Sequence, residues 1–361
     1  MFVPSDLSRA DGTTVRARTV LSCLDRYFRI SLVGMGSTTF GEPEWLVVKV
    51  PARETELFRQ LLQLPFWLVA VARILMRHKF DIVYVCNDWF GLVVYLTVQK
   101  AFKQKVIFEI HGILSEESKT WRKPTFLVWV LHCWEAIVLR QCDLILALSG
   151  HIFEFCKRYA RRLELVPVFL DTNVYRRNEG IRAALRERHG WQGKRVVGII
   201  GPFDDKWNEC ALQFLEDNMK EFDERIVFAV VGKCERKNNV ERCLYAGFVE
   251  DLPGFLSSLD TVLVARRLST SGPLNKIIQS MSCSLPVFTT PQGMVGMDYA
   301  KHGRDIIVAK ESEMARTVNS LIFNEGLMRT IGQNARQTVE KHYSCGANAA
   351  RLVHILESFP P

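Results

Sequence analysis

Short runs of Val, Ile, Leu and Phe alternate with segments of helical period along almost the whole chain. This alternation constrains the fold most strongly, because it is typical of parallel strands covered by helices on both faces of a sheet. In the first half we expect strands at 29–35, 81–85, 106–110, 143–148 and 164–168. The helices expected between them are 14–27, 54–77, 90–102, 126–141 and 151–161.

The same alternation starts again after a polar stretch, 170–193, which has the composition of a linker and contains one amphipathic segment, 181–188. The strands expected in the second half are 195–200, 225–231, 261–265, 285–289 and 305–308. The fold class predicted is α/β, with two Rossmann-like, doubly wound parallel-sheet domains. Two such domains in tandem favour a ligand site between them. The predicted domains are 1–172 and 173–344, followed by a last helix in 345–361.

The net charge of +8 lies mainly in the first half of the chain. Lys and Arg minus Asp and Glu give 24 − 17 = +7 for residues 1–177 and 23 − 22 = +1 for the rest. A basic half favours an anionic partner, which can be nucleic acid, an anionic membrane or an anionic substrate, unless it only reflects surplus surface lysines. No basic run is interleaved with aromatic residues, so nucleic acid is the least supported partner.

Ten cysteines are scattered along the 361 residues without a single Cys-x-x-Cys pair. This spacing excludes a zinc ribbon and a thioredoxin-type redox pair, and it favours reduced, mostly buried thiols in an intracellular protein. We therefore expect no metal and no cofactor. A hydrophobic content of 48% against 24% charged residues also excludes a disordered chain.

Two apolar stretches, 66–76 and 125–139, are shorter than a membrane-spanning helix and contain Arg73, His132 and Glu135. The first residues lack the pattern of a secretory signal. We therefore expect a cytoplasmic protein. Both stretches are candidates for peripheral contact with an anionic membrane at its inner face, although packing against a sheet is the commoner fate of such helices.

Three loops have the pattern of a phosphate-binding turn between a strand and a helix: 9–14, 201–205 and 269–276. The third is the most informative. Its Ser-Gly-Pro sequence suits a helix start with Pro273 at an early helical position. Free backbone amides there favour an anion, and Lys276 lies one turn further on. The alternative for Lys276 is an exposed lysine on a helix surface.

His111 follows the apolar run 106–110 and precedes Gly112, so it is expected at the carboxyl end of a strand. There it can donate a hydrogen bond to a substrate hydroxyl or take part in proton transfer. The alternative is a structural histidine that pairs with Glu116 or Glu117. The patterns of serine hydrolases, zinc metalloproteases and Walker-type kinases are missing from the sequence.

Together these segments resemble the retaining glycosyltransferases of group one, which have the GT-B fold, over residues 2–352. The first half contributes FDIVYVCNDW, VIFEIHGILSEE and CDLILALSGHIFEFCKRY. The second half contributes VVGIIGPFDDKWNECALQFLEDN, YAGFVEDLPGFLSSLD and GPLNKIIQSMSCSLPVFTTPQGMVGM.

The resemblance implies that a hexose is moved from a nucleotide-sugar, a UDP or GDP sugar, to a glycan or lipid-linked acceptor in polysaccharide biosynthesis. It implies a metal-independent reaction, a donor bound mainly by the second domain and an acceptor bound mainly by the first. It also implies that the last helix crosses back to the first domain. The catalytic residues it implies are His111 and Lys276. The donor-binding residues it implies are Gly12, Thr13, Gly201, Lys206, Phe248, Val249, Ser271, Gly272, Pro273, Leu274, Asn275 and Gln279.

The sequence departs from the family pattern in the second half. Ser271 and Gln279 stand where the family has its Glu-x7-Glu carboxylates, and Pro202 and Asn208 stand where many members have an arginine and a lysine. These departures support an alternative, a catalytically silent GT-B protein that binds a sugar nucleotide or a partner transferase. A sugar-nucleotide epimerase on the same fold is a weaker alternative.

Overall fold

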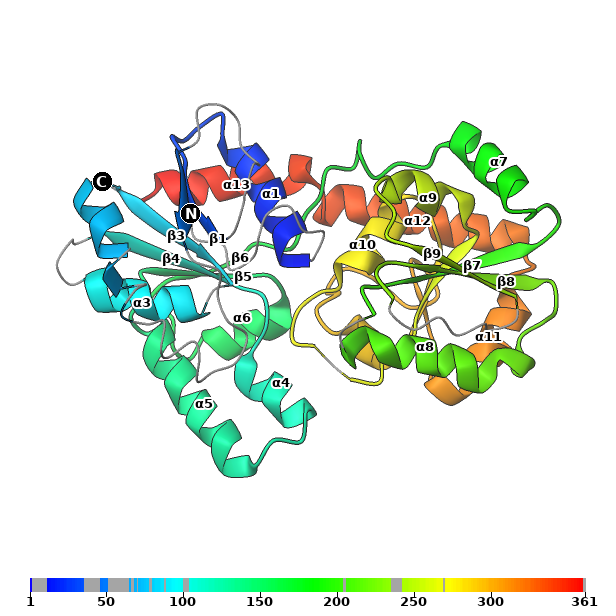
Figure 1. Cartoon of the computed structure of the whole chain (residues 1–361), viewed down its shortest axis with the longest axis horizontal. Helices are drawn as coiled ribbons and strands as arrows, with labels where there is room; N and C mark the ends of the chain where they lie inside the picture. The colour runs from blue at the N-terminus through cyan, green and yellow to red at the C-terminus, as the bar shows by residue number, and fades with distance from the viewer. Residues whose placement is uncertain are drawn as a thin grey trace. The chain divides into compact units, whose positions relative to one another are not determined.

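The computed structural model describes residues 1, 12–35, 46–50, 65, 68–69, 71–77, 80–87, 89–99, 104–203, 206–234, 242–268 and 270–359. Most of the helix expected at 54–77 lies outside these residues, as do loop residues 9–11, 204–205 and 269. The chain forms two compact units (Figure 1). Unit 1 contains Met1–Val168 and Asn348–Pro361, and unit 2 contains Phe169–Ala347.

Unit 1 has a parallel sheet of four strands in the order β3 (Ile82–Cys86), β4 (Lys105–Ile110), β5 (Leu144–Ala147) and β6 (Leu163–Leu165). A second parallel pair joins β1 (Ser31–Met35) to β2 (Leu46–Val50). Because β4 and β5 are buried on both faces, their residues are apolar apart from Lys105 and Glu109 of β4. Its helices are α1 (Gly12–Leu24), α3 (Trp89–Gln99), α4 (Leu114–Thr120), α5 (Thr125–Leu139), α6 (Gly150–Cys156) and most of α13 (Cys345–Glu357).

Unit 2 has a parallel sheet of six strands. Their order is β12 (Ile307–Val308), β11 (Val287–Thr289), β10 (Thr261–Val264), β7 (Arg195–Ile200), β8 (Ile226–Val231) and β9 (Cys243–Gly247). From β7 the chain moves outward to β8 and β9, and it then returns to the other side of β7 at β10. The carboxyl ends of β7 and β10 therefore flank the switch point of the sheet, where open α/β sheets bind ligands.

Helices cover both faces of the unit 2 sheet (Figure 1). They are α7 (Glu179–Arg188), α8 (Lys206–Asn218), α9 (Leu252–Ser258), α10 (Asn275–Ser282), α11 (Met314–Leu321) and α12 (Glu325–His342). The core between α8, α11 and the sheet contains buried aromatic rings, among them Phe214, Phe228 and Phe288.

The polar stretch expected as a linker is anchored to unit 2 through α7. Arg182 and Arg186 donate to the Asp260 carboxylate over 2.5 and 3.0 Å, and Arg182 also donates to the carbonyl of Leu259. These ion pairs are mostly buried, which favours their strength over that of surface pairs. A segment that is polar by composition is therefore part of a folded unit.

All ten cysteines are free thiols, four of them buried and the other six partly buried. In the part of the chain that the structure describes, the helices are too short or too polar to cross a membrane. In the apolar stretch 66–76, Val71, Ile74 and Leu75 are buried, whereas Met76 is exposed.

Candidate active site

A buried ion pair lies beneath His111 in unit 1. Glu109 and His111 are two residues apart at the end of β4, so both side chains project from the same face of the sheet. Arg16 of α1 donates to both carboxylate oxygens of Glu109, with Nη2 2.7 Å from Oε2. Tyr84 Oη donates to the same Oε2 over 2.5 Å, and His111 Nε2 lies 2.7 Å from Oε1. This network fixes the imidazole at the carboxyl end of the strand.

Charge neutralisation keeps Glu109 ionised despite its complete burial. Burial acts to raise the pKa of Glu109, but Arg16 and His111 outweigh it and hold the pKa well below its usual range. Burial and the adjacent carboxylate raise the pKa of Tyr84. An ionised carboxylate only accepts hydrogen bonds, so His111 Nε2 is the donor to Glu109. When the imidazole is neutral, Nδ1 is therefore the acceptor.

The sequence left open a structural role for His111, in which the imidazole pairs with Glu116 or Glu117. The structure does not have this pair. Glu116 instead lies 2.6 Å from the imidazole of His151. Glu117 folds over the loop after β4, where a Cβ on Gly112 would lie 2.4 Å from its carboxylate oxygen. A larger residue at position 112 would therefore have to displace the Glu117 carboxylate.

Cys86, Glu109 and His111 bring one sulfur, one oxygen and one nitrogen within 4.8 Å of one another. These are donor types that zinc accepts. Glu109 is, however, already neutralised by the Arg16 guanidinium, which would repel a second cation at the same carboxylate. The donor set therefore fits an ion-pair network better than a metal site.

Glu135 of α5 holds the start of α4, directly after the His111 loop. Its carboxylate accepts the backbone N–H groups of Leu114 at 2.6 Å and Ser115 at 3.3 Å. Burial raises the pKa of Glu135 to about 7, against the lowering effect of these hydrogen bonds. The carboxylate satisfies amides that the first turn of a helix leaves unpaired, which ties the loop to α5.

A second polar centre lies in unit 2 at the switch point of the sheet. Lys276, in the first turn of α10, donates from Nζ to the carbonyl of Ile200 at the end of β7 and, over 2.6 Å, to Asn208 Oδ1. Arg266, two residues after β10, donates from Nη1 to the same Asn208 oxygen over 3.3 Å. Arg266 is 4% exposed. Two cationic side chains thus converge beside the amino end of α10, an arrangement that favours an anion.

The loop before α10 differs from expectation at Pro273. We predicted Pro273 at an early helical position, but α10 begins at Asn275 with Leu274 as its N-cap residue. Pro273 lies before the helix, and the backbone of Gly296, at φ +80°, packs against it. A Cβ on Gly296 would lie 2.6 Å from the Pro273 nitrogen. Ser271 and Gly272 are buried in the same loop.

Gln279, expected at a donor ribose, donates from Nε2 to the Tyr175 hydroxyl over 2.9 Å. Ser282 and Arg336 hold the Tyr175 carbonyl, each over 2.7 Å. The amide of Gln279 therefore anchors the segment that enters unit 2. The Tyr175 hydroxyl can both donate and accept, and here it accepts from the NH₂ group of Gln279.

The other predicted donor residues lie at strand ends and helix starts. Gly12 and Thr13 open α1, Lys206 opens α8, and Gly201 directly follows β7. Gly201 donates its backbone N–H to the carbonyl of Val231 over 2.7 Å. Phe248 and Val249 follow β9 at the edge of the sheet, and Phe248 is 64% exposed.

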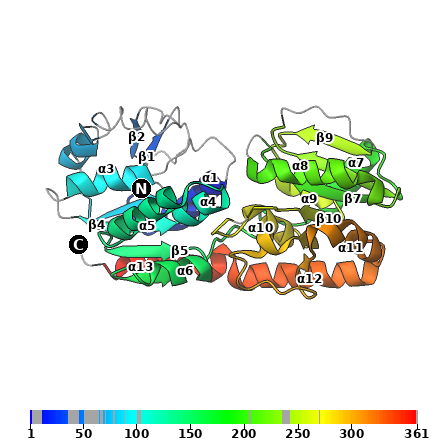
Figure 2. The ribbon, with the colours of Figure 1, turned by 90° about the horizontal axis from the view of Figure 1, so that it is seen from below.

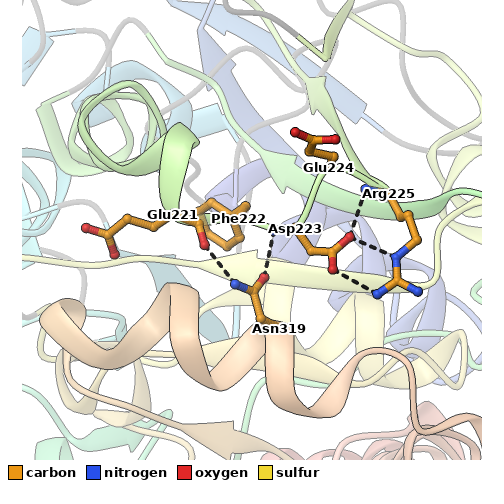
Figure 3. Close-up of a pocket in the computed structure, with 6 residues that line it drawn as sticks. All are labelled: Glu221, Phe222, Asp223, Glu224, Arg225 and Asn319. Carbon is orange, nitrogen blue, oxygen red and sulfur yellow. Dashed lines mark hydrogen bonds and ion pairs between the residues drawn. The ribbon is translucent and has the colours of Figure 1, made fainter.

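A shallow pocket elsewhere in unit 2 lies before β8, at the amino end of that strand (Figure 3). Asn319 of α11 donates to the Glu221 carbonyl over 2.7 Å and accepts the backbone N–H of Asp223 over 3.0 Å. The Arg225 hydrogen bonds to Asp223 lower the pKa of that carboxyl to about 2. Because these groups pair with one another and lie away from the carboxyl ends of the strands, the pocket is not the candidate site.

Four residues of these centres were not predicted from the sequence: Arg16, Tyr84, Glu109 and Arg266. A charged residue inside the apolar run 105–110 was a signal for Glu109, because charges are rarely buried without a partner. Arg266 had a weaker signal, its position just after a buried strand.

Several solved structures share this fold. HepE of Anabaena, solved with UDP and glucose, matches with a TM-score of 0.78 and 17% identity over 99% of this chain and 98% of that chain. Sucrose-phosphate synthase of Thermosynechococcus elongatus matches with a TM-score of 0.84 and 13% identity over 99% and 97%. WaaG, a glycosyltransferase involved in lipopolysaccharide biosynthesis, matches with a TM-score of 0.72 and 11% identity over 96% of each chain. At these identities the likeness establishes the fold.

Two parallel-sheet α/β units with this likeness define a GT-B protein. The model of Glycosyltransferase Family 4 matches residues 10–174, and that of Glycosyl transferases group 1 matches residues 194–324. These two glycosyltransferase models together cover most of the chain, which is therefore a glycosyltransferase of the GT-B fold, as the sequence motifs predicted. No curated protein matches the sequence significantly.

Proposed function

We propose that this glycosyltransferase moves a hexose, with retention of configuration, from a nucleoside-diphosphate sugar to a hydroxyl of a glycan or lipid-linked acceptor. The observation that supports it most is the convergence of Lys276 and Arg266 on Asn208 at the switch point of unit 2. HepE was solved with UDP and with UDP-glucose, so UDP-sugars are the first donors to test.

The proposed mechanism is a front-face displacement without a metal ion. The leaving diphosphate oxygen takes the proton of the incoming hydroxyl while the bond to the sugar breaks. Lys276, Arg266 and the amides at the start of α10 stabilise the negative charge that develops on the diphosphate. His111, held by Glu109 through Nε2, accepts a hydrogen bond from a sugar hydroxyl at Nδ1 and orients the transferred sugar.

The change Lys276→Ala tests this assignment. It removes a charge that acts on the leaving group, so the transfer rate should fall by at least about 30-fold, or about 2 kcal/mol of barrier. Lys310→Ala, at an exposed lysine of the same unit, is the control and should keep its rate. Steady-state kinetics with the preferred donor measure both, and circular dichroism checks folding. A rate that survives within a factor of about three, under about 1 kcal/mol, contradicts the role of Lys276.

A catalytically silent GT-B protein is the second candidate. It is favoured by Gln279, whose amide is engaged with Tyr175 where the family has a carboxylate. Such a protein would bind a sugar nucleotide without turnover.

A further inference from the structure

Helix α5 carries an apolar face that the fold of unit 1 leaves exposed. Phe126, Trp129, Val130 and Ile137 are 72%, 65%, 41% and 58% exposed. At about 100° per residue these four positions fall within an arc of about 100°, with Cys133 in its middle. Four of the nine large hydrophobic side chains that are exposed in the described part of the chain therefore lie on one stripe of one helix.

The opposite face of α5 already packs against unit 1. Glu135, Val138 and Leu139 are buried, and Trp134 lies against Trp89 with ring centroids 5.4 Å apart. Helix α4 lies beside α5 in both views (Figure 1, Figure 2). The packing of α5 on the rest of unit 1 thus does not use the exposed stripe of Phe126, Trp129, Val130 and Ile137. A contiguous exposed apolar patch of this kind marks a binding surface.

Basic side chains lie at both ends of the stripe. Lys119, Arg122 and Lys123 are exposed before the helix, and Arg140 is exposed at its end. Arg140 also lies 5.3 Å from the centre of the Tyr159 ring. The Tyr159 hydroxyl lies 2.9 Å from the imidazole of His132, which is on α5. These contacts bring the segment with exposed Arg158 and Arg161 to the same end of the helix.

The neighbouring acidic groups do not cancel this charge at the stripe. Glu135 is buried and holds the start of α4, Glu116 pairs with His151 at 2.6 Å, and Glu154 pairs with Lys157 at 3.7 Å. The apolar face is therefore bordered by cations along its axis, and it lies in the half of the chain with the charge excess of 24 − 17 = +7. This charge pattern complements an anionic surface.

We propose that the exposed face of α5 docks this protein on the surface of an anionic lipid bilayer. The fifteen residues of α5 extend about 22 Å, less than the roughly 30 Å of a hydrocarbon core, so the helix lies in the plane of the interface. Trp129 then reaches the headgroup level that indole rings favour, and the basic residues at both ends contact lipid phosphates. This inference does not depend on the proposed transfer reaction.

Flotation of the full chain with vesicles tests the proposal. The two vesicle types are phosphatidylcholine alone and an equimolar mixture with phosphatidylglycerol. The expected result is binding to the mixture that is at least about tenfold tighter than binding to phosphatidylcholine alone, because each basic residue near the surface adds attraction.

Three variants separate the contributions. Phe126→Ser/Trp129→Ser/Ile137→Ser removes the stripe, and Arg122→Gln/Lys123→Gln/Arg140→Gln removes the flanking charge. Each should weaken binding to the mixed vesicles by about tenfold or more. The control Tyr27→Ser/Val174→Ser changes exposed side chains that are not on α5, 61% and 57% exposed, and should bind like the unchanged protein.

Three results would overturn the proposal. The first is a failure of the unchanged protein to float with mixed vesicles, and the second is full binding by the stripe variant. The third is a dimer in sedimentation velocity that the stripe variant converts to a monomer, since the face would then join two copies of the chain. Circular dichroism and urea unfolding check that each variant folds. Neither measurement depends on the proposed reaction, so a failure of that reaction leaves this test intact.

Discussion

Asn208 stands where many family members have a lysine, and its structural environment explains how a neutral residue can be accommodated there. Its amide oxygen accepts from Lys276 over 2.6 Å and from Arg266 over 3.3 Å. A second lysine at this position would place three cations together, which is costly at a partly buried site. Arg266 thus supplies, after the end of β10, a positive charge that position 208 lacks.

The change Arg266→Ala should weaken UDP binding by about 10- to 100-fold, because hydrogen bonds to charged groups contribute about 1.5–3 kcal/mol. The adjacent Arg267 is the matched control, since it is 40% exposed and pairs with Glu311 over 2.6 Å. Isothermal titration with UDP compares Arg266→Ala with Arg267→Ala. Equal affinities for the two variants would show that Arg266 has no role in the donor site.

Single residues of the candidate site were predictable from the sequence only where a motif carried them. His111 and Lys276 were found in this way. Arg16 and Glu109 lie on α1 and β4, and their pairing depends on how that helix covers that strand. A lone acidic residue in a strand indicates that a partner exists, but it does not say which of the basic residues supplies it.

At the scale of secondary structure, each strand expected from the sequence has a counterpart in the structure, whereas some other elements were missed. The strand 195–200 was predicted with the bounds that β7 has. The segments β2, β9 and α4 were not predicted. Seven residues give α4 barely two turns, and it is held through Glu135, which is on the following helix. Its stability comes from tertiary packing, which periodicity does not reveal.

The carboxyl of Glu135 should make stability depend on pH. Its folded pKa of about 7 lies above the ordinary value of 4.5, so its contribution is fully present below pH 4.5 and is lost as the pH rises through 7. The loss amounts to about 3 kcal/mol. The free energy of unfolding of Glu135→Gln, relative to that of the unchanged protein, should therefore rise between pH 5 and pH 8. Urea unfolding of both proteins at both pH values measures this difference. The prediction fails if the two proteins keep a constant difference.

At the scale of the whole molecule, the alternation of strands and helices was sufficient to predict two parallel-sheet units, and the matches to GT-B structures agree with it. The order of strands was not predictable in the same way. Because β10 lies beside β7, Arg266 and Lys276 meet Asn208 although the three are far apart in the sequence. Strand order is a tertiary property, and it decides which loops share a site.

The central claim is that this chain transfers sugar from a nucleotide donor. A screen of UDP-, GDP- and ADP-sugars, with release of the nucleoside diphosphate as readout, tests it most directly. We predict release from at least one UDP-sugar that depends on Lys276 and increases when an acceptor is added. Binding of the sugar nucleotide without any release of diphosphate, across the whole panel and with acceptors present, would contradict the claim and identify a silent GT-B protein.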